Sequence, residues 1–324
     1  MDPIELTRKI RMALAPCSLG AWPTPLDARP DLESASRAEV SLKREDRSSS
    51  RYGGNKVRGL EFLLAGLPAG TVCVTIGAVG STHCLATAVH ARHLGLRTAL
   101  AQFPQPETEA SQALAAASVE RADFVARSRS HAGFPLALWR AWRTAGRLGR
   151  PRWIPGGGAA PAAVIGHLLA GLELSNQLPA PPDAIVLPLG SGGTAAGLAL
   201  AMAVLGWPTT VFAVRVAPAL IANVWRMRNL SRGAVRLLAH HGIPIPDPPS
   251  RIPLVLDGLG AGYGHPTPAG EAARELAARH GVTLDPTYGA KAFAFLLQRR
   301  TCNVRRVVFW HTFGVPCPTP EPER

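Results

Sequence analysis

The chain has 324 residues, 47% of them apolar and 18% charged, so it can bury a sizeable core and is not a disordered chain. Thirty-five basic and 22 acidic residues give a formal charge of +13, and 35 − 4 = 31 of the basic residues are arginines. Such a charge can indicate nucleic acid or an anionic membrane as partner. Because the arginines are dispersed and not interleaved with stacking aromatics, we expect neither.

Targeting, membrane and metal signals are weak in this sequence. The N-terminal stretch Met1–Cys17 is charged throughout, which is unlike a secretory signal, and no uninterrupted apolar run reaches the ~18 residues that span a bilayer. The five cysteines are scattered and form neither a disulfide framework nor a zinc pattern. We therefore expect a cytoplasmic protein without a metal ion.

Short apolar runs alternate with longer helical patterns along the whole chain. The predicted strands are Glu39–Lys43, Thr71–Ile76, Arg97–Gln102, Ala184–Leu189, Val211–Val216 and Arg306–Trp310. The predicted helices are Lys56–Ala65, Thr82–Leu94, Thr108–Ala116, Pro135–Arg147, Pro161–Gln177, Gly193–Leu205 and Pro268–His280. This alternation predicts an α/β fold with parallel strands buried on both faces.

Glycine and proline content predicts loops at Arg147–Gly158, Leu178–Asp183 and Gly242–Pro253, and a disordered tail at Val315–Arg324. In parallel α/β sheets, ligands bind beyond the carboxyl ends of strands, where glycine-rich loops lead into helices. The candidate motifs lie at such places.

The segment Tyr52-Gly53-Gly54-Asn55-Lys56 stands before a predicted helix. Its glycines allow a close backbone approach to a ligand, and Lys56 is a candidate amine nucleophile. The same letters also suit a tight turn followed by a solvated lysine, and by themselves they favour that reading.

The segment Gly190–Gly197 follows an apolar strand directly and reads GSGGTAAG. A strand, a loop of small residues and a helix start together direct several backbone N–H groups at an anion, and two hydroxyls add donors. It lacks the ending of a nucleotide loop and the spacing of a dinucleotide fingerprint. We favour a phosphate monoester site over a closely packed turn.

The segment Gly77–His83 is a third junction of strand and helix. Ser81 and the amides after it could hold a carboxylate, although a plain N-cap explains a serine there equally well. Near the C-terminus, Tyr263 and Tyr288 lie in turns where a hydroxyl can face a site, or where the ring simply packs. A further hydroxyl, that of Thr312, follows the last predicted strand.

Taken in this order, the segments resemble the pyridoxal-phosphate family of 1-aminocyclopropane-1-carboxylate deaminase and D-cysteine desulfhydrase. The matching residues span Lys43 to Gly314 and are Lys43–Asp46, Gly53–Lys56 with Leu60–Phe62, Gly77, Ala78, Ser81, His83, Ile154, Pro155, Gly157, Gly158, Ser191–Gly197, Gly262–Gly264, Leu284–Pro286, Tyr288, Lys291, His311 and Thr312.

The resemblance implies a fold type II enzyme like the tryptophan synthase β chain: two open, mostly parallel twisted sheets flanked by helices. Its large domain would comprise residues 1–47 and 160–324, and its small α/β domain residues 48–159. Pyridoxal 5'-phosphate would lie in a cleft between the domains. A small amino acid would be the substrate, and the enzyme would be a homodimer.

The resemblance also implies roles for individual residues. Lys56 would carry the cofactor, and the residues contacting it would be Asn55, Lys56, Thr82, Ser191, Gly192, Gly193, Thr194, Ala195, Gly197 and Thr312. The catalytic groups would be Lys56, Ser81, Tyr263 and Tyr288, and the substrate would meet Ser81, Thr82, His83, Tyr263 and Tyr288.

Within the family, the deaminase pattern places glutamate directly after the tyrosine of an Asp-Pro-x-Tyr motif. In this chain that tyrosine is Tyr288, and the next residue is Gly289. His83 also fits the desulfhydrase branch. We therefore expect α,β-elimination of a D-cysteine-like substrate to a keto acid, ammonia and sulfide. Ring opening of the deaminase type, β-replacement in specialised metabolism and a catalytically degenerate binding protein are the alternatives, because Gly80, Thr82 and Phe313 depart from the family pattern.

Overall fold

The computed structural model describes residues 2–247, 254–298 and 304–313. Its helices are α1 Pro3–Leu14, α2 Glu33–Ser36, α3 Lys56–Leu63, α4 Thr82–His93, α5 Glu109–Arg121, α6 Phe134–Leu148, α7 Pro161–Ser175, α8 Gly193–Leu205, α9 Val224–His240, α10 Pro268–Arg279 and α11 Gly289–Leu297. Its strands are β1 Leu26–Ala28, β2 Glu39–Arg44, β3 Thr71–Ala78, β4 Arg97–Phe103, β5 Phe124–Arg127, β6 Arg150–Trp153, β7 Ala184–Leu189, β8 Thr210–Arg215, β9 Leu254–Asp257 and β10 Arg306–His311. The predicted disordered tail, Val315–Arg324, lies outside the described residues, as does the end of the predicted loop Gly242–Pro253.

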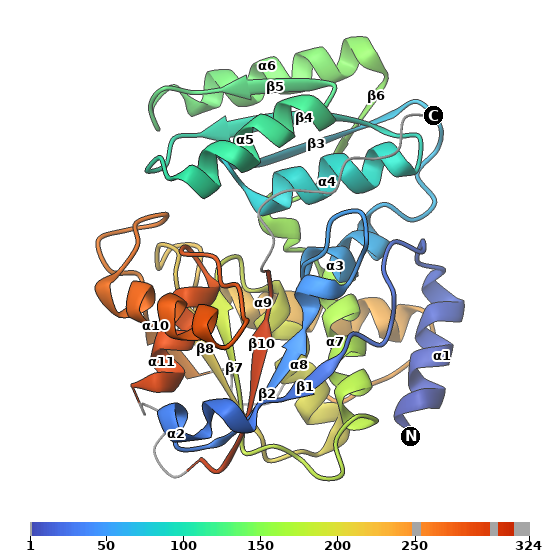
Figure 1. The fold of residues 1–324 in the computed structure, drawn as a ribbon. Helices are drawn as coiled ribbons and strands as arrows, with labels where there is room; N and C mark the ends of the chain where they lie inside the picture. The colour runs from blue at the N-terminus through green and yellow to red at the C-terminus, as the bar shows by residue number, and fades with distance from the viewer. Residues whose placement is uncertain (1, 248–253, 299–303, 314–324) are drawn as a thin grey trace.

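The larger sheet has six strands in the order β1-β2-β10-β7-β8-β9. Only its edge strand β1 is antiparallel to its neighbour, and the other pairs are parallel. The last strand in the chain, β10, is inserted between β2 and β7, so that Phe309 is in register with both Leu42 and Val186. The two ends of the chain therefore build one sheet (Figure 1).

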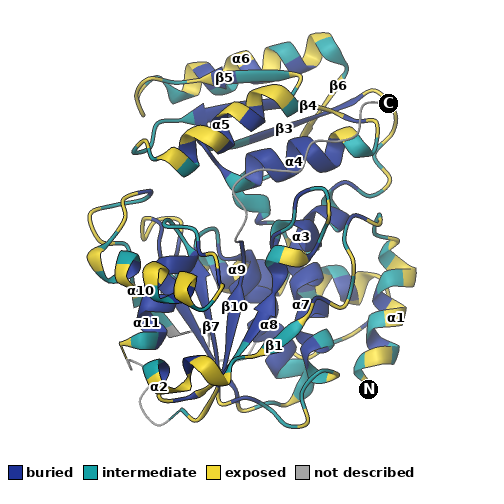
Figure 2. Cartoon of the chain, viewed as in Figure 1, coloured by how far each residue is buried: buried dark blue, intermediate teal, exposed yellow. Residues whose placement is uncertain are grey.

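Side chains of this sheet alternate between two hydrophobic layers, as the pleat of a strand requires. Ile185 and Leu187 of β7 join the layer formed by α1, α7, α8 and α9, whereas Ala184 and Val186 join the layer formed by α10 and α11. Helices therefore cover both faces, and the strands are dark blue in the burial view (Figure 2). This explains why the strands read as continuous apolar runs.

The smaller sheet has four parallel strands in the order β5-β4-β3-β6. Val72 and Val74 pack on one face with the alanines of α6, and Cys73 packs on the other face with α4 and α5. In Figure 1, this sheet and its helices form the upper half of the molecule. The α/β class with two mostly parallel sheets is confirmed, while the domain limits remain a prediction.

Helix α3 lies where the two halves meet. Val57 and Leu60 belong to the hydrophobic cluster that includes Cys73 and Leu85 of the smaller sheet's half. On another side, α3 packs closely on α7: a Cβ on Gly59 would lie 2.9 Å from the Cβ of Ala163. The lysine that begins α3 is therefore held by both halves.

The prediction of a loop over Arg147–Gly158 was wrong, because residues 150–153 form β6. All four residues of β6 are exposed, so the strand carries no apolar signal. The helices α1, α9 and α11 and the short strands β1, β5 and β9 were not predicted either. None of the described helices has the length and apolar character needed to cross a membrane.

Candidate active site

The predicted site residues lie at the starts of three helices and at the end of one strand. Lys56 is the first residue of α3, Ser81 is the N-cap of α4, and Gly192 is the N-cap of α8. Thr312 directly follows β10. The loops at Ser81, Gly192 and Thr312 follow the parallel strands β3, β7 and β10, which is where α/β sheets bind ligands.

Backbone contacts with Thr312 position Lys56. The N–H of Asn55 donates to the carbonyl of Thr312 at 2.9 Å. Gly54 has a φ of +119°, and a Cβ on it would approach that same carbonyl to 3.2 Å, so a glycine is required there. Burial lowers the pKa of the Lys56 amine to about 8. Lys56 is half-buried, and an amine with a lowered pKa that can still be reached is suited to act as a nucleophile and base.

A polar chain runs from Asn55 into the core. Its side-chain amide donates to the hydroxyl of Thr194 at 2.8 Å, and Thr194 in turn lies 3.4 Å from Nε2 of His167 on α7. Burial and the neighbouring Lys56 and Arg58 charges hold the pKa of His167 well below its usual value. His167 is therefore neutral, and its Nε2 can accept a hydrogen bond from the Thr194 hydroxyl.

The loop after β7 presents backbone groups at the start of α8. Gly192 has a φ of +92°, and the Ser191 hydroxyl donates to the carbonyl of Gly157 at 3.2 Å. A Cβ on Gly157 would lie 2.5 Å from the hydroxyl oxygen of Ser191. Arg226 donates from Nε to the Ser191 carbonyl at 3.1 Å. Helix-start amides, a hydroxyl and a nearby arginine together suit an anion.

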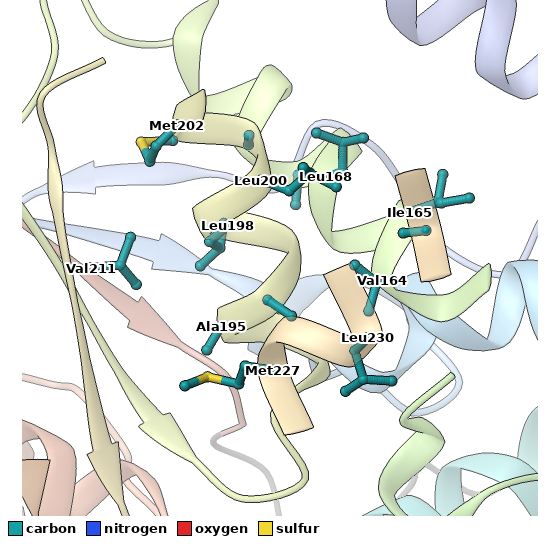
Figure 3. Packing of buried hydrophobic residues seen from close by; sticks show 14 of the residues in the cluster. Val164, Ile165, Leu168, Ala195, Leu198, Leu200, Met202, Val211, Met227 and Leu230 are labelled. Atoms are coloured by element: carbon teal, nitrogen blue, oxygen red, sulfur yellow. The ribbon is translucent and has the colours of Figure 1, made fainter. Parts of the chain in front are cut away.

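Ala195 and Gly197, also predicted at this site, lie inside α8. Ala195 belongs to the core cluster between α7, α8 and α9, which Figure 3 shows from close by. A Cβ on Gly197 would come within 2.4 Å of the Cβ of His167. The absence of side-chain bulk at Gly197 therefore lets α8 approach α7.

Ser81, Thr82 and His83 begin α4. The Ser81 hydroxyl accepts from the N–H of Cys84 at 3.3 Å, which makes it an N-cap as well as a candidate carboxylate contact. His83 lies 2.9 Å, at Nε2, from the hydroxyl of Thr75. Burial, followed by the charge of Lys56, lowers the pKa of His83 to about 3, so this ring is neutral. Thr82 is partly exposed.

Tyr263 and Tyr288 form a half-buried pair whose hydroxyls contact each other, with ring centroids 6.0 Å apart. Burial raises the pKa of Tyr263 to about 12 and that of Tyr288 well above its usual value. Cys84 and Asp285 raise both values further, which places the Cys84 thiol close to the pair. The N–H of Cys84 in turn donates to the Ser81 hydroxyl.

Asp285 holds Tyr288 in place. Its carboxylate accepts from the N–H groups of Thr287, Tyr288 and Gly289 at 3.0, 2.6 and 2.8 Å, and so caps α11. Burial raises the pKa of Asp285 to about 6, although these three donors oppose the shift. A Cβ on Gly190 would lie 3.4 Å from the Tyr288 ring, which puts the ring beside the loop Gly190–Gly192 that precedes α8.

The contacts join Asn55, next to Lys56 in the chain, to Thr194 and Thr312, and they pair Tyr263 with Tyr288. Ser81 is bonded to Cys84 at the start of α4. Sequence reasoning did not assign Cys84, His167 or Asp285 to the site. The position of Cys84, three residues after Ser81, places it on the same helix face and was a usable signal. His167 gave no such signal, because the residues around it in α7 do not mark it as a histidine that faces a polar site.

Phe313, where the family pattern has glycine, packs away into the core. Its ring lies 5.5 Å from the ring of Tyr52, and it belongs to the cluster that contains Val57 and Leu60. Its side chain therefore packs against α3.

Comparison with known proteins gives a consistent result. The model of the family described as pyridoxal-phosphate dependent enzyme matches residues 17–312. A D-cysteine desulfhydrase of Salmonella choleraesuis (strain SC-B67) is 32% identical, with 96% of each chain covered. A nocardicin C-9' epimerase of Nocardia uniformis subsp. tsuyamanensis is 35% identical and covers 84% of this chain and 85% of its own.

Among solved structures, a crystal structure of an ACC deaminase homologue superposes with a TM-score of 0.80. It is 29% identical, and 95% of each chain is covered. The processed form of threonine deaminase isoform 2 from Solanum lycopersicum is 16% identical with a TM-score of 0.66. It covers 97% of this chain and 86% of its own, and it shares the fold.

Proposed function

The chain belongs to the family of pyridoxal-phosphate dependent enzymes, and from this premise we propose that it catalyses α,β-elimination from a small D-cysteine-like amino acid. With water, such a substrate yields a keto acid, ammonia and sulfide. The observation that carries this proposal is the half-buried pair of protonated tyrosines, whose hydroxyls contact each other and of which Tyr288 has its ring beside Gly190.

The residues present fit pyridoxal phosphate. The helix-start amides at Gly192–Thr194 and the Ser191 hydroxyl suit its phosphate, and a Cβ on Gly157 would lie 2.5 Å from that hydroxyl oxygen. Lys56 supplies a desolvated primary amine for its aldehyde. When bound, the cofactor withdraws electrons from the substrate's α-carbon.

Lys56 acts as the proton acceptor in this proposal. An amine with a pKa of about 8 is partly unprotonated at neutral pH, so it can remove the α-proton without a further base. The helix-start amides after Ser81 orient the substrate carboxylate by the same physics that favours anions at any helix N-terminus. His83, in the first turn of α4, is neutral and so adds no charge beside the substrate carboxylate.

Tyr263 and Tyr288 supply the proton that the leaving group needs. Both phenols are protonated at neutral pH, and their raised pKa values extend this state to higher pH. A protonated phenol can donate a proton to the departing sulfur, but it does not attack carbon as a phenolate would. This favours elimination of hydrogen sulfide over nucleophilic ring opening. Thr312, a hydroxyl in place of a carboxylate, is proposed to meet the ring nitrogen, which limits negative charge at carbon and suits elimination.

Colour and product release test this function. We expect purified protein with pyridoxal phosphate to be yellow, and the Lys56→Ala variant to be colourless. Sulfide and keto acid should form from D-cysteine, and Tyr288→Phe should lower that rate at least about tenfold while keeping the colour. Colourless wild-type protein would refute the assignment of Lys56. Colour without sulfide would refute the substrate and leave a changed substrate or the degenerate binding protein.

Epimerisation is a second candidate, favoured by the 35% identity with the nocardicin C-9' epimerase. Deprotonation of the substrate by Lys56 would then be followed by reprotonation from the other side, and nothing would be eliminated. Running the D-cysteine assay in deuterated water and analysing the recovered amino acid by chiral chromatography separates the two. Recovery of L-cysteine that carries deuterium at its α-carbon, without release of sulfide, would identify an epimerase.

The remaining assignments follow the family resemblance. We propose a homodimer in the cytoplasm, with a large domain of residues 1–47 and 160–324 and a small domain of residues 48–159. Analytical ultracentrifugation tests the dimer: a sedimentation coefficient for a particle of twice 34.2 kDa is expected, and a single monomeric species would contradict it.

A further inference from the structure

Lys291 is a buried lysine that the proposed mechanism does not use. It belongs to the first turn of α11, three residues after Tyr288, and it is 3% exposed. Helix α10 packs against its stem: a Cβ on Gly270 would lie 3.6 Å from Cγ of Lys291. Burying an amine costs free energy unless its N–H groups find acceptors. The acceptors of Lys291 therefore indicate what this side chain holds.

The amine of Lys291 reaches the loop Leu259–Gly264, which carries Tyr263 between β9 and α10. Its Nζ donates to the carbonyl of Leu259 at 2.8 Å and lies 3.5 Å from the carbonyl oxygen of Gly262. The second carbonyl belongs to the peptide bond that leads into Tyr263. Because both acceptors are backbone atoms, Lys291 fixes the path of the loop on either side of them.

The loop has little else to hold Tyr263. Gly262 and Gly264 flank the tyrosine with φ values of +148° and +82°, and glycine has more backbone freedom than any other residue. Beyond the immediate neighbours of the loop in the chain, the described residues that hydrogen-bond to it are Lys291 and Tyr288 alone. The Tyr263 ring also packs against the layer formed by α1, α7, α8 and α9. Apolar packing is not directional, however, and so it does not aim a hydroxyl.

We propose that Lys291 is a positioning residue, which holds the loop Leu259–Gly264 so that the hydroxyl of Tyr263 stays in contact with that of Tyr288. The proposal rests on the role of these tyrosines in the proposed function. Each hydroxyl has one proton, so in a bonded pair one phenol donates to the other, and the second keeps its proton for a third group. The contact therefore leaves one phenolic proton available for the departing sulfur. Since Tyr288 and Lys291 both belong to the start of α11, this helix places both members of the pair.

Nuclear magnetic resonance of the full chain as purified, with no substrate added, tests the contact. The sequence has three tyrosines, so protein with labelled tyrosine rings gives few signals, and Tyr52→Phe, Tyr263→Phe and Tyr288→Phe assign them. The centroids of the Tyr263 and Tyr288 rings are 6.0 Å apart, which brings ring protons close enough for a nuclear Overhauser effect. In Lys291→Met, which keeps the stem but removes the donors, we expect this effect to be lost.

Three further variants make the result specific. Lys291→Arg keeps N–H donors on a stem of similar length and should retain the Overhauser effect. Lys9→Met removes an exposed lysine of α1 and should leave the effect unchanged. If Lys291→Met does not fold, Lys291→Gln gives the same measurement, because its side chain stays polar but is too short to reach Leu259.

The kinetics of sulfide release from D-cysteine give a second readout. Lys291→Met and Tyr263→Phe should lower kcat by the same factor with little change in KM. The double variant should be no slower than either single variant, because both substitutions remove the same contact.

An Overhauser effect that survives in folded Lys291→Met would overturn the proposal. So would its loss in Lys9→Met, or a loss in Lys291→Arg as complete as that in Lys291→Met. Additive losses of kcat in the double variant would overturn it as well. The resonance measurements need no turnover, so they stand even if wild-type protein releases no sulfide and the proposed function fails.

Discussion

At the residue scale, burial sets the charge of each proposed catalytic group. Lys56 has no anionic partner among the described side chains, and desolvation lowers the pKa of its amine to about 8. The same effect has the opposite consequence for Tyr263, whose pKa is raised to about 12. Desolvation disfavours whichever form is charged, and so it brings an amine closer to neutrality and keeps a phenol protonated.

The pH dependence of cofactor uptake follows from the Lys56 amine. Only the unprotonated amine attacks an aldehyde, so the rate of colour formation in cofactor-free protein should rise with pH and level off above about pH 8. Stopped-flow absorbance after mixing with pyridoxal phosphate measures this rate, and Lys56→Ala gives the background. A rate that still increased tenfold per pH unit between 8 and 10 would show an ordinary, solvated lysine.

The same pKa affects stability. The folded chain binds fewer protons at Lys56 than the unfolded chain does between about pH 8 and the ordinary lysine value of 10.5. The contribution of Lys56 to the free energy of unfolding therefore rises with pH in that window.

At the scale of elements, small residues decide how closely helices approach the site. A Cβ on Gly197 of α8 would lie 2.4 Å from the Cβ of His167 and 2.7 Å from the carbonyl of Val164, both on α7. Figure 3 shows Val164 among the apolar side chains packed between these helices. Helix α8 begins after the loop Gly190–Gly192, and α7 carries His167. The contact between the two helices therefore sets the distance between this loop and His167.

A pair of glycine substitutions tests that contact. Gly197→Ala should destabilise the chain by about 1–3 kcal/mol, because α7 and α8 must separate. Gly146→Ala, in the last turn of α6, meets only a Pro151 atom at 3.9 Å and should stabilise by up to about 0.5 kcal/mol through helix propensity. Urea denaturation measures both. Equal effects of the same sign would mean that α8 packs less closely than described.

Asp285 tests how α11 holds Tyr288. Asp285→Ala leaves the N–H groups of Thr287, Tyr288 and Gly289 without their acceptor and should lower the free energy of unfolding by about 1–2 kcal/mol. Asp257→Ala is the control, because that carboxylate accepts only one backbone bond and is largely exposed; it should cost less than about 0.5 kcal/mol. Urea denaturation of the two variants would refute the capping role if their losses were the same.

At the scale of the whole molecule, the proposed cofactor site draws on both halves. Ser81 and His83 follow the smaller sheet, whereas Thr312 and the loop Gly190–Gly193 follow strands of the larger one. Helix α3, with Lys56, packs against both. A ligand that contacts all of these segments would couple the unfolding of the two halves.

Bound pyridoxal phosphate should therefore raise the melting temperature of the whole chain in one transition. At a concentration 100-fold above its dissociation constant, the gain in stability is about 2.7 kcal/mol. Pyridoxal, which lacks the phosphate, should give a clearly smaller shift because the amides at Gly192–Thr194 gain no anion, and so should Lys56→Ala with pyridoxal phosphate. Scanning calorimetry measures all three. Equal shifts for the two ligands would contradict a phosphate site at α8.

Local sequence patterns determined much of this protein. Apolar runs such as Ala184–Leu189 could be recognised as buried parallel strands, and glycine-rich segments after them marked loops at helix starts. The family membership and its cofactor followed from these motifs taken together, although the roles of the individual site residues remain predictions. The strand β6 could not be found in this way, because its four residues are exposed and tertiary packing holds it in place. Helix α9 did carry a local signal that was missed: Asn223 caps it, and Met227, Leu230, Ala234 and Leu238 are buried at helical spacing.

Only the tertiary structure decided which residues that are distant in the sequence form ion pairs or hydrogen bonds with each other. Arg58 and Glu173 are 115 residues apart, and Asn55 and Thr194 are 139 apart, yet each pair is joined by hydrogen bonds. Phe313 departs from the family pattern, but its ring packs against Tyr52. Burial and side-chain partners set the charge of a group, and both arise only when the two halves of the chain are folded together.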